Sequence, residues 1–247
     1  MCEQHKYPGR ELPLFETATN WKKYFTSLIR KYIKNKVLEV GAGLGTSTLI
    51  LNDNAASEWI LLEPDEEHAI EIEKKISSHQ LPSNCRLIRG TLNQLPGGLK
   101  FETILYIDVL EHIHEDRNEL KIAAEFLNDG GYLVVLSPAF QFLYNRFDAA
   151  IGHYRRYTIN QLKQITPSYM KLVKIHYLDS AGFFSSLANR LFLNQSYPTP
   201  KQISFWDKWM IPVSRITDPI LLHSFGKTIL AIWKRNNDVS KTGNSSQ

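Results

Sequence analysis

Short apolar runs alternate with amphipathic stretches along the first two thirds of this chain. Apolar runs bounded by polar or turn residues are typical of buried strands, whereas apolar residues spaced three and four apart are typical of helices. The clearest helix covers residues 65–76, because it opens with acidic residues and closes with Lys74 and Lys75, which suits the helix dipole. The predicted strands are 36–40, 58–62, 86–89, 103–108, 132–136, 171–177 and 226–234, and the other predicted helices are 46–51, 115–127 and 158–165.

This alternation predicts an α/β fold with a mostly parallel sheet and helices on both of its faces. The segment between the last two strands lacks the helix pattern that is typical of a crossover connection. We therefore expect these strands to form an edge pair that contains one antiparallel strand. Residues 128–131, Asn-Asp-Gly-Gly, predict a helix end. We expect a helical cover at 1–35, one domain at 36–235 with a helical cap at 180–223, and a disordered polar tail at 236–247.

Composition places the chain among ordinary globular proteins. Of its 247 residues, 43% are hydrophobic and 22% are charged, which argues against disorder. The net charge of +4 does not by itself indicate nucleic acid as a partner. Two cysteines, Cys2 and Cys85, are too few for a disulfide framework or a thiolate zinc site, and they suit a reducing cytoplasm. The first residues hold no apolar signal core, and no apolar run is long enough to span a membrane.

The sharpest motif is a glycine turn where the first strand ends and a helix begins. Gly41, Gly43 and Gly45 follow the spacing Gly-x-Gly-x-Gly, with Ala42 inside it. The dinucleotide fingerprint has a different spacing, and the Gly-Lys-Ser/Thr ending of a phosphate loop is missing. Glycines at such a turn allow a ligand to approach the backbone closely, and the alternative is a simple tight connection.

A second element strengthens the first. Glu63 follows the second strand, 22 positions after Gly41. A carboxylate at the end of this strand can accept hydrogen bonds from two ribose hydroxyls, and the alternative is a solvated carboxylate that begins a helix. The glycine turn and this acid together predict a nucleoside site.

Residues 108–114, Asp-Val-Leu-Glu-His-Ile-His, follow the fourth strand. Ligands of an open α/β sheet lie beyond the carboxyl ends of its strands, so these residues face the predicted site. His112 could act as a general base that takes a proton from a hydroxyl or amine of a substrate. Its alternative role is structural support of the loop.

A second polar cluster lies at 153–157, His-Tyr-Arg-Arg-Tyr, after an aromatic loop. Its arginines could grip a carboxylate or phosphate, and aromatic rings could line a pocket. The alternatives are a surface stretch paired with Asp148 or Glu111, and an RNA-binding patch. His153 is predicted to be a catalytic residue or to shape the substrate site. Tyr144, Tyr154, Arg155 and Arg156 are predicted to bind the substrate.

Four segments in succession resemble the motifs of class I S-adenosylmethionine-dependent methyltransferases. They are "VLEVGAGLGTST", "LLEPD", "ILYIDVLEHIHED" and "LNDGGYLVVLSP", and the resemblance is clear over residues 36–140. It is weaker over "FETATNWKKYF" and "FDAAIGHYRRYT". It implies a Rossmann-like sheet of seven strands, one of them antiparallel, and S-adenosyl-L-methionine as the cofactor.

The resemblance also implies which residues contact that cofactor. Glu39 and the glycine turn would surround its methionine part, Glu63 would hold its ribose, and Asp108 would lie near its amino group. Thr91 stands where many members carry an aspartate that bonds adenine, which is a departure from the pattern. The implied cofactor-binding set is Glu39, Gly41, Ala42, Gly43, Gly45, Glu63, Pro64, Thr91, Leu92, Asp108 and Val109.

The predicted function is therefore methyl transfer from S-adenosylmethionine. The "HYRRYT" segment resembles methyltransferases near polysaccharide or lipid-linked sugar pathways, which favours a small-molecule or glycan/lipid-linked acceptor over nucleic acid. The alternatives are an RNA or protein methyltransferase, a non-catalytic cofactor-binding module, and a nicotinamide oxidoreductase, which the glycine spacing disfavours. No metal site is expected, because no histidine has ligand spacing with carboxylates on one helix face.

Two surface features complete the predictions, and the sequence does not specify an oligomeric state. The segment Asn-Trp-Lys-Lys-Tyr at 20–24 predicts a helix over the cofactor mouth, with simple helix packing as the alternative for Trp21. Aromatic residues Phe205, Trp206 and Trp209 beside Lys201 and Lys208 allow a weak contact with a membrane surface.

Overall fold

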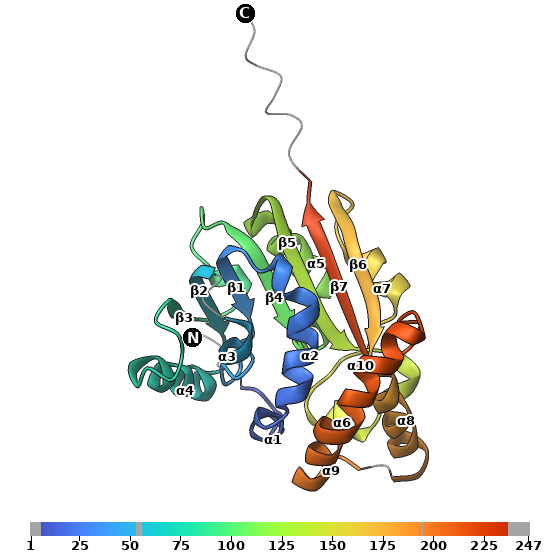
Figure 1. Ribbon diagram of the computed structural model, residues 1–247. Helices are drawn as coiled ribbons and strands as arrows, with labels where there is room; N and C mark the ends of the chain where they lie inside the picture. The colour runs from blue at the N-terminus through green and yellow to red at the C-terminus, as the bar shows by residue number, and fades with distance from the viewer. Residues whose placement is uncertain (1–5, 53–55, 194, 237–247) are drawn as a thin grey trace, which may run out of the picture.

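The computed structural model describes residues 6–52, 56–193 and 195–236. Seven strands form one twisted sheet that helices cover on both faces (Figure 1). The predicted disordered tail lies outside the described residues apart from Asn236. The strands are β1 (Asn35–Val40), β2 (Ala56–Glu63), β3 (Cys85–Arg89), β4 (Phe101–Ile107), β5 (Leu127–Pro138), β6 (Met170–Leu178) and β7 (Thr228–Arg235).

The strand order is β3-β2-β1-β4-β5-β7-β6, and all pairs among the first five strands of this order are parallel. β7 lies between β5 and β6 and runs antiparallel to both. This confirms the predicted seven-stranded sheet with one antiparallel strand. From β1 the chain first adds β2 and β3 toward one edge of the sheet, and it then continues from β4 toward the other edge. Ligands of such sheets bind outside the carboxyl ends of the strands at this point between β1 and β4.

The helices agree with the predicted periodicity, and Thr158 caps α7 as expected. β5 begins earlier than predicted, at Leu127 rather than 132. The register between β4 and β5 shifts after Leu127, and Gly130 has a φ of 77°, so the turn residues 128–131 form an irregularity inside the strand. The helices are α1 (Leu12–Glu16), α2 (Thr19–Ile29), α3 (Thr48–Leu51), α4 (Glu66–Ser77), α5 (Asp116–Phe126), α6 (Arg146–Ala150), α7 (Ile159–Ile165), α8 (Ser180–Ala188), α9 (Pro200–Phe205) and α10 (Ile211–Ile220).

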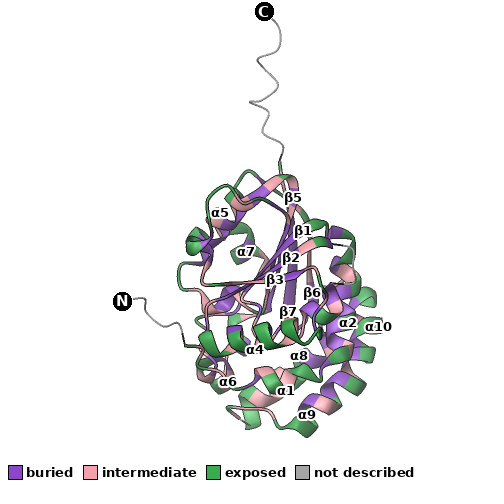
Figure 2. Cartoon of the chain, turned by 90° about the vertical axis from the view of Figure 1, so that its left-hand side faces the viewer, coloured by how far each residue is buried: buried purple, intermediate pink, exposed green. Residues whose placement is uncertain are grey.

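Two apolar clusters, one on each face of the sheet, form the core. Neighbouring residues of β1 illustrate this division, because Val37 joins the cluster under α2 and Leu38 joins the cluster under α5 and α7. The strands are buried along most of their length (Figure 2). Burying one such side chain contributes about 1.5–3 kcal/mol, so these two clusters are the main source of stability.

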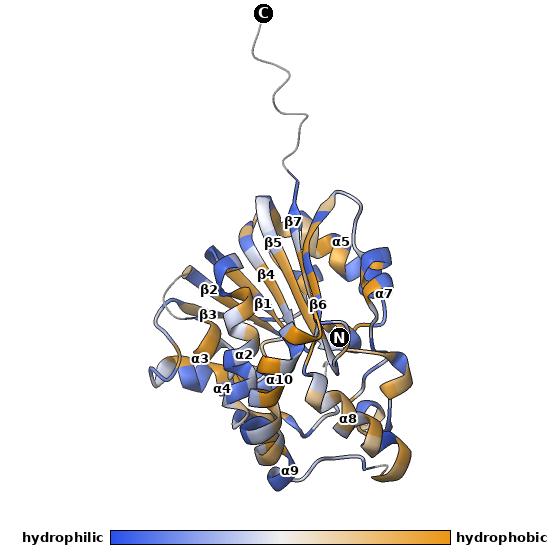
Figure 3. Ribbon diagram, turned by 45° about the vertical axis from the view of Figure 1, so that its right-hand side comes forward, coloured by the Kyte–Doolittle hydropathy of each residue, from blue (hydrophilic) through white to orange (hydrophobic). Residues whose placement is uncertain are grey.

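Helices α8, α9 and α10 form the predicted insertion between β6 and β7, at the end of the sheet toward which the parallel strands point (Figures 1 and 3). Two buried aspartates dock it. Asp218 accepts hydrogen bonds from the backbone of Asp179 and from the Tyr24 hydroxyl, at 2.8 Å each. Asp179 in turn accepts one from the Trp206 indole at 2.7 Å. Because both carboxylates are fully buried and hydrogen-bonded, the insertion is fixed to α2 and to the sheet.

Within the described residues, no helix is both long and apolar enough to cross a membrane.

Candidate active site

The glycine turn connects β1 to α3 at the carboxyl edge of the sheet. Gly41, Gly43 and Gly45 have φ values of 64°, 58° and 69°, a region that residues with a Cβ atom rarely adopt. A Cβ atom at Gly41 would also lie 2.8 Å from the side chain of Val109. The turn thus needs glycine for its backbone conformation and for the close approach of the loop after β4.

Glu63 ends β2 directly beside this turn. One carboxylate oxygen, Oε2, accepts the Gly43 backbone N–H at 2.7 Å, and Oε1 accepts the Asp65 backbone N–H at 3.0 Å. His68 lies 3.7 Å from the same carboxylate. The acid that was predicted to bind ribose therefore lies against the glycine turn, at the place where a nucleoside ligand would meet both.

Glu39 is buried near the end of β1, two residues before the turn. Its Oε2 accepts hydrogen bonds from the Thr48 hydroxyl at 2.7 Å and the Trp59 indole at 2.8 Å. Burial raises the pKa of Glu39 to about 7, against these two hydrogen bonds, which lower it. In this arrangement Glu39 ties the first turn of α3 to β2.

The remaining cofactor candidates lie along the same edge of the sheet. Thr91 and Gln94 form a reciprocal capping box after β3, and Leu92 beside them is buried. Asp108 leaves β4 with a φ of 55°, a conformation that is uncommon outside glycine and concentrates at functional sites. Pro64 and Val109 are half-buried next to Glu63 and Gly41.

An N-terminal segment, residues 7–12, lies over this edge. The Tyr7 backbone N–H donates to Asp65 at 2.7 Å, and the Tyr7 ring lies 5.2 Å from the His112 ring. Leu12 lies close to Gly43, and a cavity of about 530 Å³ opens between this segment, Leu44 and α4.

The segment predicted to cover the cofactor mouth, residues 20–24, belongs to α2 and packs elsewhere. Trp21 is buried against Phe25 and Trp206, with ring centroids 5.5 and 5.9 Å away, and its backbone N–H donates to Asp207. The structure therefore shows the packing alternative for Trp21, because an apolar face at helical spacing is buried most favourably against other apolar side chains.

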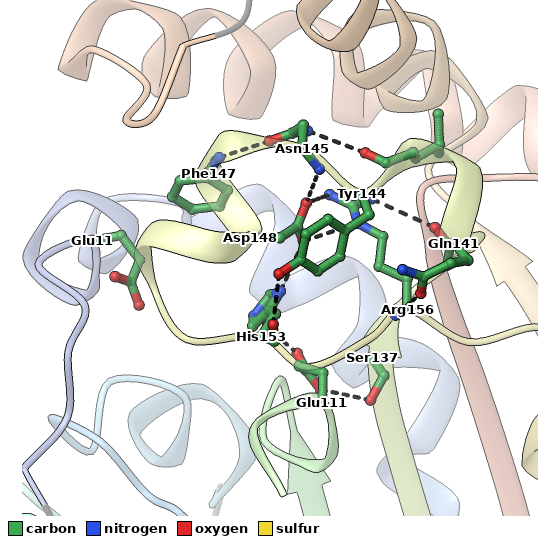
Figure 4. A network of polar contacts seen from close by, with 12 residues as sticks. Glu11, Glu111, Ser137, Gln141, Tyr144, Asn145, Phe147, Asp148, His153 and Arg156 are labelled. Atoms are coloured by element: carbon green, nitrogen blue, oxygen red, sulfur yellow. Dashed lines mark hydrogen bonds and ion pairs between the residues drawn. The ribbon is translucent and has the colours of Figure 1, made fainter. Parts of the chain in front are cut away.

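The loops after β4 and β5 bring a charged cluster together (Figure 4). His153 Nδ1 lies 2.8 Å from Asp148, and Arg156 donates two hydrogen bonds to the same carboxylate, at 2.9 Å each. His153 Nε2 faces Glu111 Oε1 at 3.7 Å, and the Ser137 hydroxyl donates to Glu111 Oε2 at 2.8 Å. The His112 and His153 rings are edge to face, with centroids 4.5 Å apart. The two predicted catalytic histidines are thus neighbours.

Burial and charge set different protonation states in this cluster. Burial, together with the charge of His153, lowers the pKa of His112 to about 3, so its imidazole is neutral. Burial also acts to lower the pKa of His153, but the hydrogen bond to Asp148 and the charge of Glu111 outweigh it and raise that pKa above its usual value. Burial raises the pKa of Glu111 to about 8. His153 is therefore the more basic of the two histidines.

The four predicted substrate-binding residues surround this cluster. Arg156 is buried and fully engaged with Asp148, which is the pairing alternative considered above. Arg155 bonds Asp116 at 2.7 Å and the His114 carbonyl at 2.9 Å. The Tyr144 hydroxyl donates to the His153 carbonyl at 2.8 Å, and Tyr154 is exposed with its ring against His114. Both guanidinium groups thus have protein partners.

The fold brings together three residues that could act as metal ligands, whereas the sequence predicts no metal site. Glu111, His112 and His153 each offer one ligand atom, and these atoms lie within 4.8 Å of one another. Helix spacing could not reveal the group, because the residues come from two loops that follow different strands.

Sequence reasoning missed several residues of the site. The sequence suggested Asp148 only as an ion-pair partner of the arginines, although Asn145 and Asp148, three positions apart at the start of α6, also form a capping box. No pattern marks Tyr7 or Glu11, which only the fold brings to the cluster. Glu11 is buried, and its Oε2 has no hydrogen-bond partner among the described residues.

These features define a class of protein. A sheet of this order, with a glycine turn after β1 and an acid at the end of β2, is the architecture of class I S-adenosylmethionine-dependent methyltransferases. The family model of a methyltransferase domain matches residues 16–181, and the chain belongs to this family. The protein is an enzyme whose cofactor is S-adenosylmethionine.

Solved structures share the fold at low sequence identity. The [4+2]-cyclase SpnF matches with a TM-score of 0.61 and 14% identity, over 87% of this chain and 81% of that chain. The N-methyltransferase NodS from Bradyrhizobium japonicum WM9 matches with a TM-score of 0.55 and 12% identity, over 92% of this chain and 100% of that chain. NodS in complex with S-adenosyl-L-homocysteine also matches, with a TM-score of 0.55 and 12% identity, over 90% of this chain and 88% of that chain. No curated protein matches the sequence.

The residues present fit this cofactor. Its methionine part carries a sulfonium and an ammonium group, and the buried carboxylate of Glu11 has one oxygen without a hydrogen-bond partner among the described residues. Glu63 ends β2 beside this turn and bonds the Gly43 N–H, and a carboxylate at this place can also accept hydrogen bonds from ribose hydroxyls. A cationic nucleoside therefore matches both the charge and the shape of this edge.

Proposed function

We propose that the enzyme methylates a hydroxyl of a small-molecule or glycan-type acceptor, which enters beside the cluster of Glu111, His112, Asp148 and His153. The observation that carries this proposal is the position of the cluster. The loop after β4 contacts Gly41 through Val109 and also carries Glu111 and His112, so the cofactor turn and the cluster share one loop. The cofactor supplies an activated methyl group, and the protein supplies position, proton transfer and exclusion of water.

Within the cluster, we assign the acceptor's proton to His153 and a supporting role to His112, which exchanges the roles expected from the sequence. Asp148 accepts from His153 Nδ1 and so fixes the tautomer that leaves Nε2 free, the arrangement by which a carboxylate orients a catalytic imidazole. His112 is less basic because burial lowers its pKa to about 3. When the bound cofactor methylates the acceptor hydroxyl, His153 Nε2 would accept the proton that the hydroxyl releases.

We propose further that the acceptor is lipid-linked, because the insertion carries a surface suited to an anionic membrane. Phe205, Trp209, Val213, Ile216 and Ile220 follow helical spacing and are all exposed, Trp209 by 67% and Ile220 by 72%. We call these five residues the apolar stripe.

The charges around the apolar stripe are of one sign. Lys201, Lys208 and Arg215 are exposed on the same helical segment, whereas Asp207 and Asp218 are buried and hydrogen-bonded. An apolar face flanked by exposed cations is the pattern of helices that lie in an anionic lipid surface. Buried Cys85 is a free thiol, which fits a reducing compartment, so we place the enzyme in the cytoplasm at the inner side of a membrane.

Labelled methyl transfer tests the acceptor class. The purified enzyme is incubated with cell extract and S-adenosylmethionine that carries a radioactive methyl group, and lipid, soluble small-molecule, RNA and protein fractions are counted. We expect label in the lipid or small-molecule fraction, and its loss with His153→Ala but not with His114→Ala. Label in RNA or protein alone would refute the acceptor class, and no label in any fraction would favour a binding module without turnover.

A further inference from the structure

We propose that Glu111, His112 and His153 form a binding site for one divalent metal ion of the zinc type. Their three ligand atoms lie within 4.8 Å of one another, and Glu111 Oε1 lies 3.7 Å from His153 Nε2. Two ligands of a tetrahedral zinc ion, each about 2.0–2.1 Å from it, are roughly 3.3 Å apart. Small rotations of these side chains therefore bring them to coordination distance.

An unsatisfied carboxylate oxygen points to a missing cation. Glu111 is fully buried, and its Oε1 has no hydrogen-bond partner among the described residues. The 3.7 Å separation from His153 Nε2 exceeds the length of an N–H···O hydrogen bond, so the imidazole does not satisfy this oxygen. Leaving a buried carboxylate oxygen unpaired is costly, and either a bound cation or the proton that the raised pKa of Glu111 favours would remove that cost.

The surroundings hold two of the three candidate ligands by their other polar atoms. Asp148 bonds His153 Nδ1, and Ser137 donates to Glu111 Oε2. His112 Nδ1 lies beside Gly152, since a Cβ atom at that glycine would be 3.9 Å from it. Metal ligands are typically oriented in this way, with a carboxylate or carbonyl on the second nitrogen of each histidine. The three residues therefore each keep one free atom for an ion.

Two imidazole nitrogens and one carboxylate oxygen suit zinc or a related first-row divalent ion, and they leave at least one coordination position open. The role of such an ion rests on the proposed function. An acceptor hydroxyl bound at the open position would be more acidic and would lose its proton to water. With an ion bound, His153 is a ligand, and the ion takes over from the imidazole the task of activating the hydroxyl.

Direct metal binding tests this inference without any need for the acceptor. Untagged full-length protein is stripped of metal and titrated with Zn²⁺ by calorimetry and with Co²⁺ by visible absorption, whose intensity reports the coordination geometry. We expect one ion per chain. Glu111→Gln and His153→Ala should each weaken its affinity by at least tenfold, and Asp148→Asn should weaken it by about 10–100-fold because it only orients His153.

His114→Ala is the matched control, because His114 is an exposed histidine two residues from His112. The affinity for S-adenosylhomocysteine, measured on every variant, shows that the fold and the cofactor site are intact. No Zn²⁺ binding, or equal binding by the wild type and Glu111→Gln, overturns the metal site while cofactor binding persists. Failure of the wild type to bind S-adenosylhomocysteine would instead count against the proposed function.

Discussion

Asp148 organises the acceptor side of the site more than any other single residue. It is buried, it bonds the imidazole of His153, and it receives two hydrogen bonds from Arg156. Replacement by asparagine would leave two buried cations without their shared anion. Removing one partner of such a group is strongly destabilising, because the remaining charges stay desolvated.

We therefore expect Asp148→Asn to lower the free energy of unfolding by about 3–5 kcal/mol at neutral pH, as measured by urea denaturation. Despite burial, the hydrogen bonds from His153 and Arg156 hold the pKa of Asp148 below its usual value, so its stabilisation is present above the unfolded pKa and is lost as pH falls through the folded one.

The raised pKa of His153 makes its contribution to stability depend on pH in the opposite direction. Its contribution is complete below the usual histidine pKa and is lost as pH rises through the raised value. The difference between wild type and Asp148→Asn should thus be largest between about pH 4 and pH 6.5, where both groups are charged in the native protein. A difference that does not change with pH would show that the ion pair does not govern stability.

Among the elements, the helical segment of α9 and α10 shows how much the sequence alone reveals. The sequence indicated aromatic residues beside lysines, but not which of them face solvent. Trp206 turned out to be buried on Asp179, whereas Trp209 is exposed. Burial depends on contacts with Trp21, Asp179 and Lys227, which are remote in sequence, so periodicity could place the stripe on a helix but could not say which face was covered.

We expect the wild-type protein to float with vesicles that contain an anionic phospholipid and to stay behind with purely zwitterionic ones, with salt weakening the association. The double variant Trp209→Ser/Ile216→Ser should abolish flotation, because it removes the centre of the apolar stripe. Leu49→Ser, which changes an exposed leucine on α3, is the control and should float like the wild type. If the wild-type protein stays in solution with anionic vesicles, the proposal that it binds a membrane surface is wrong.

Other elements differ in how well they could be predicted. The strands β1, β2 and β4 were placed correctly because runs buried on both faces have an unmistakable apolar pattern. β5 was predicted too short, because Asn128 and the glycines at 130 and 131 have the composition of a turn even where they lie within a strand. The sequence predicts a cover within residues 1–35 and places a helix of it at 20–24; the residues of this stretch that lie near His112 and Gly43 are Tyr7 and Leu12, whose position depends on tertiary contacts.

For the whole molecule, the sequence could predict that the glycine turn and Glu63 lie together, but not the contacts that join the residues of the histidine cluster. The glycine turn and Glu63 lie close in sequence, and their spacing reflects the local geometry of one β-α-β unit. The acceptor cluster combines Glu111 and Ser137 with residues of α6 and the loop after it, which meet only once the sheet has formed. Its chemistry therefore depends on topology, which a pattern of single residues does not encode.

The central claim is that the cofactor turn and the histidine cluster form one active site. NMR of protein with isotope-labelled histidine tests this directly, by titration with S-adenosylhomocysteine. We expect the imidazole signals of His112 and His153 to shift as the ligand saturates, while those of exposed His114 and distant His176 stay in place. Glu63→Ala, which loses charge-assisted hydrogen bonds worth about 1.5–3 kcal/mol each, should move the titration to at least tenfold higher ligand concentration. Saturation of the protein with no change at His112 or His153 would contradict a shared site.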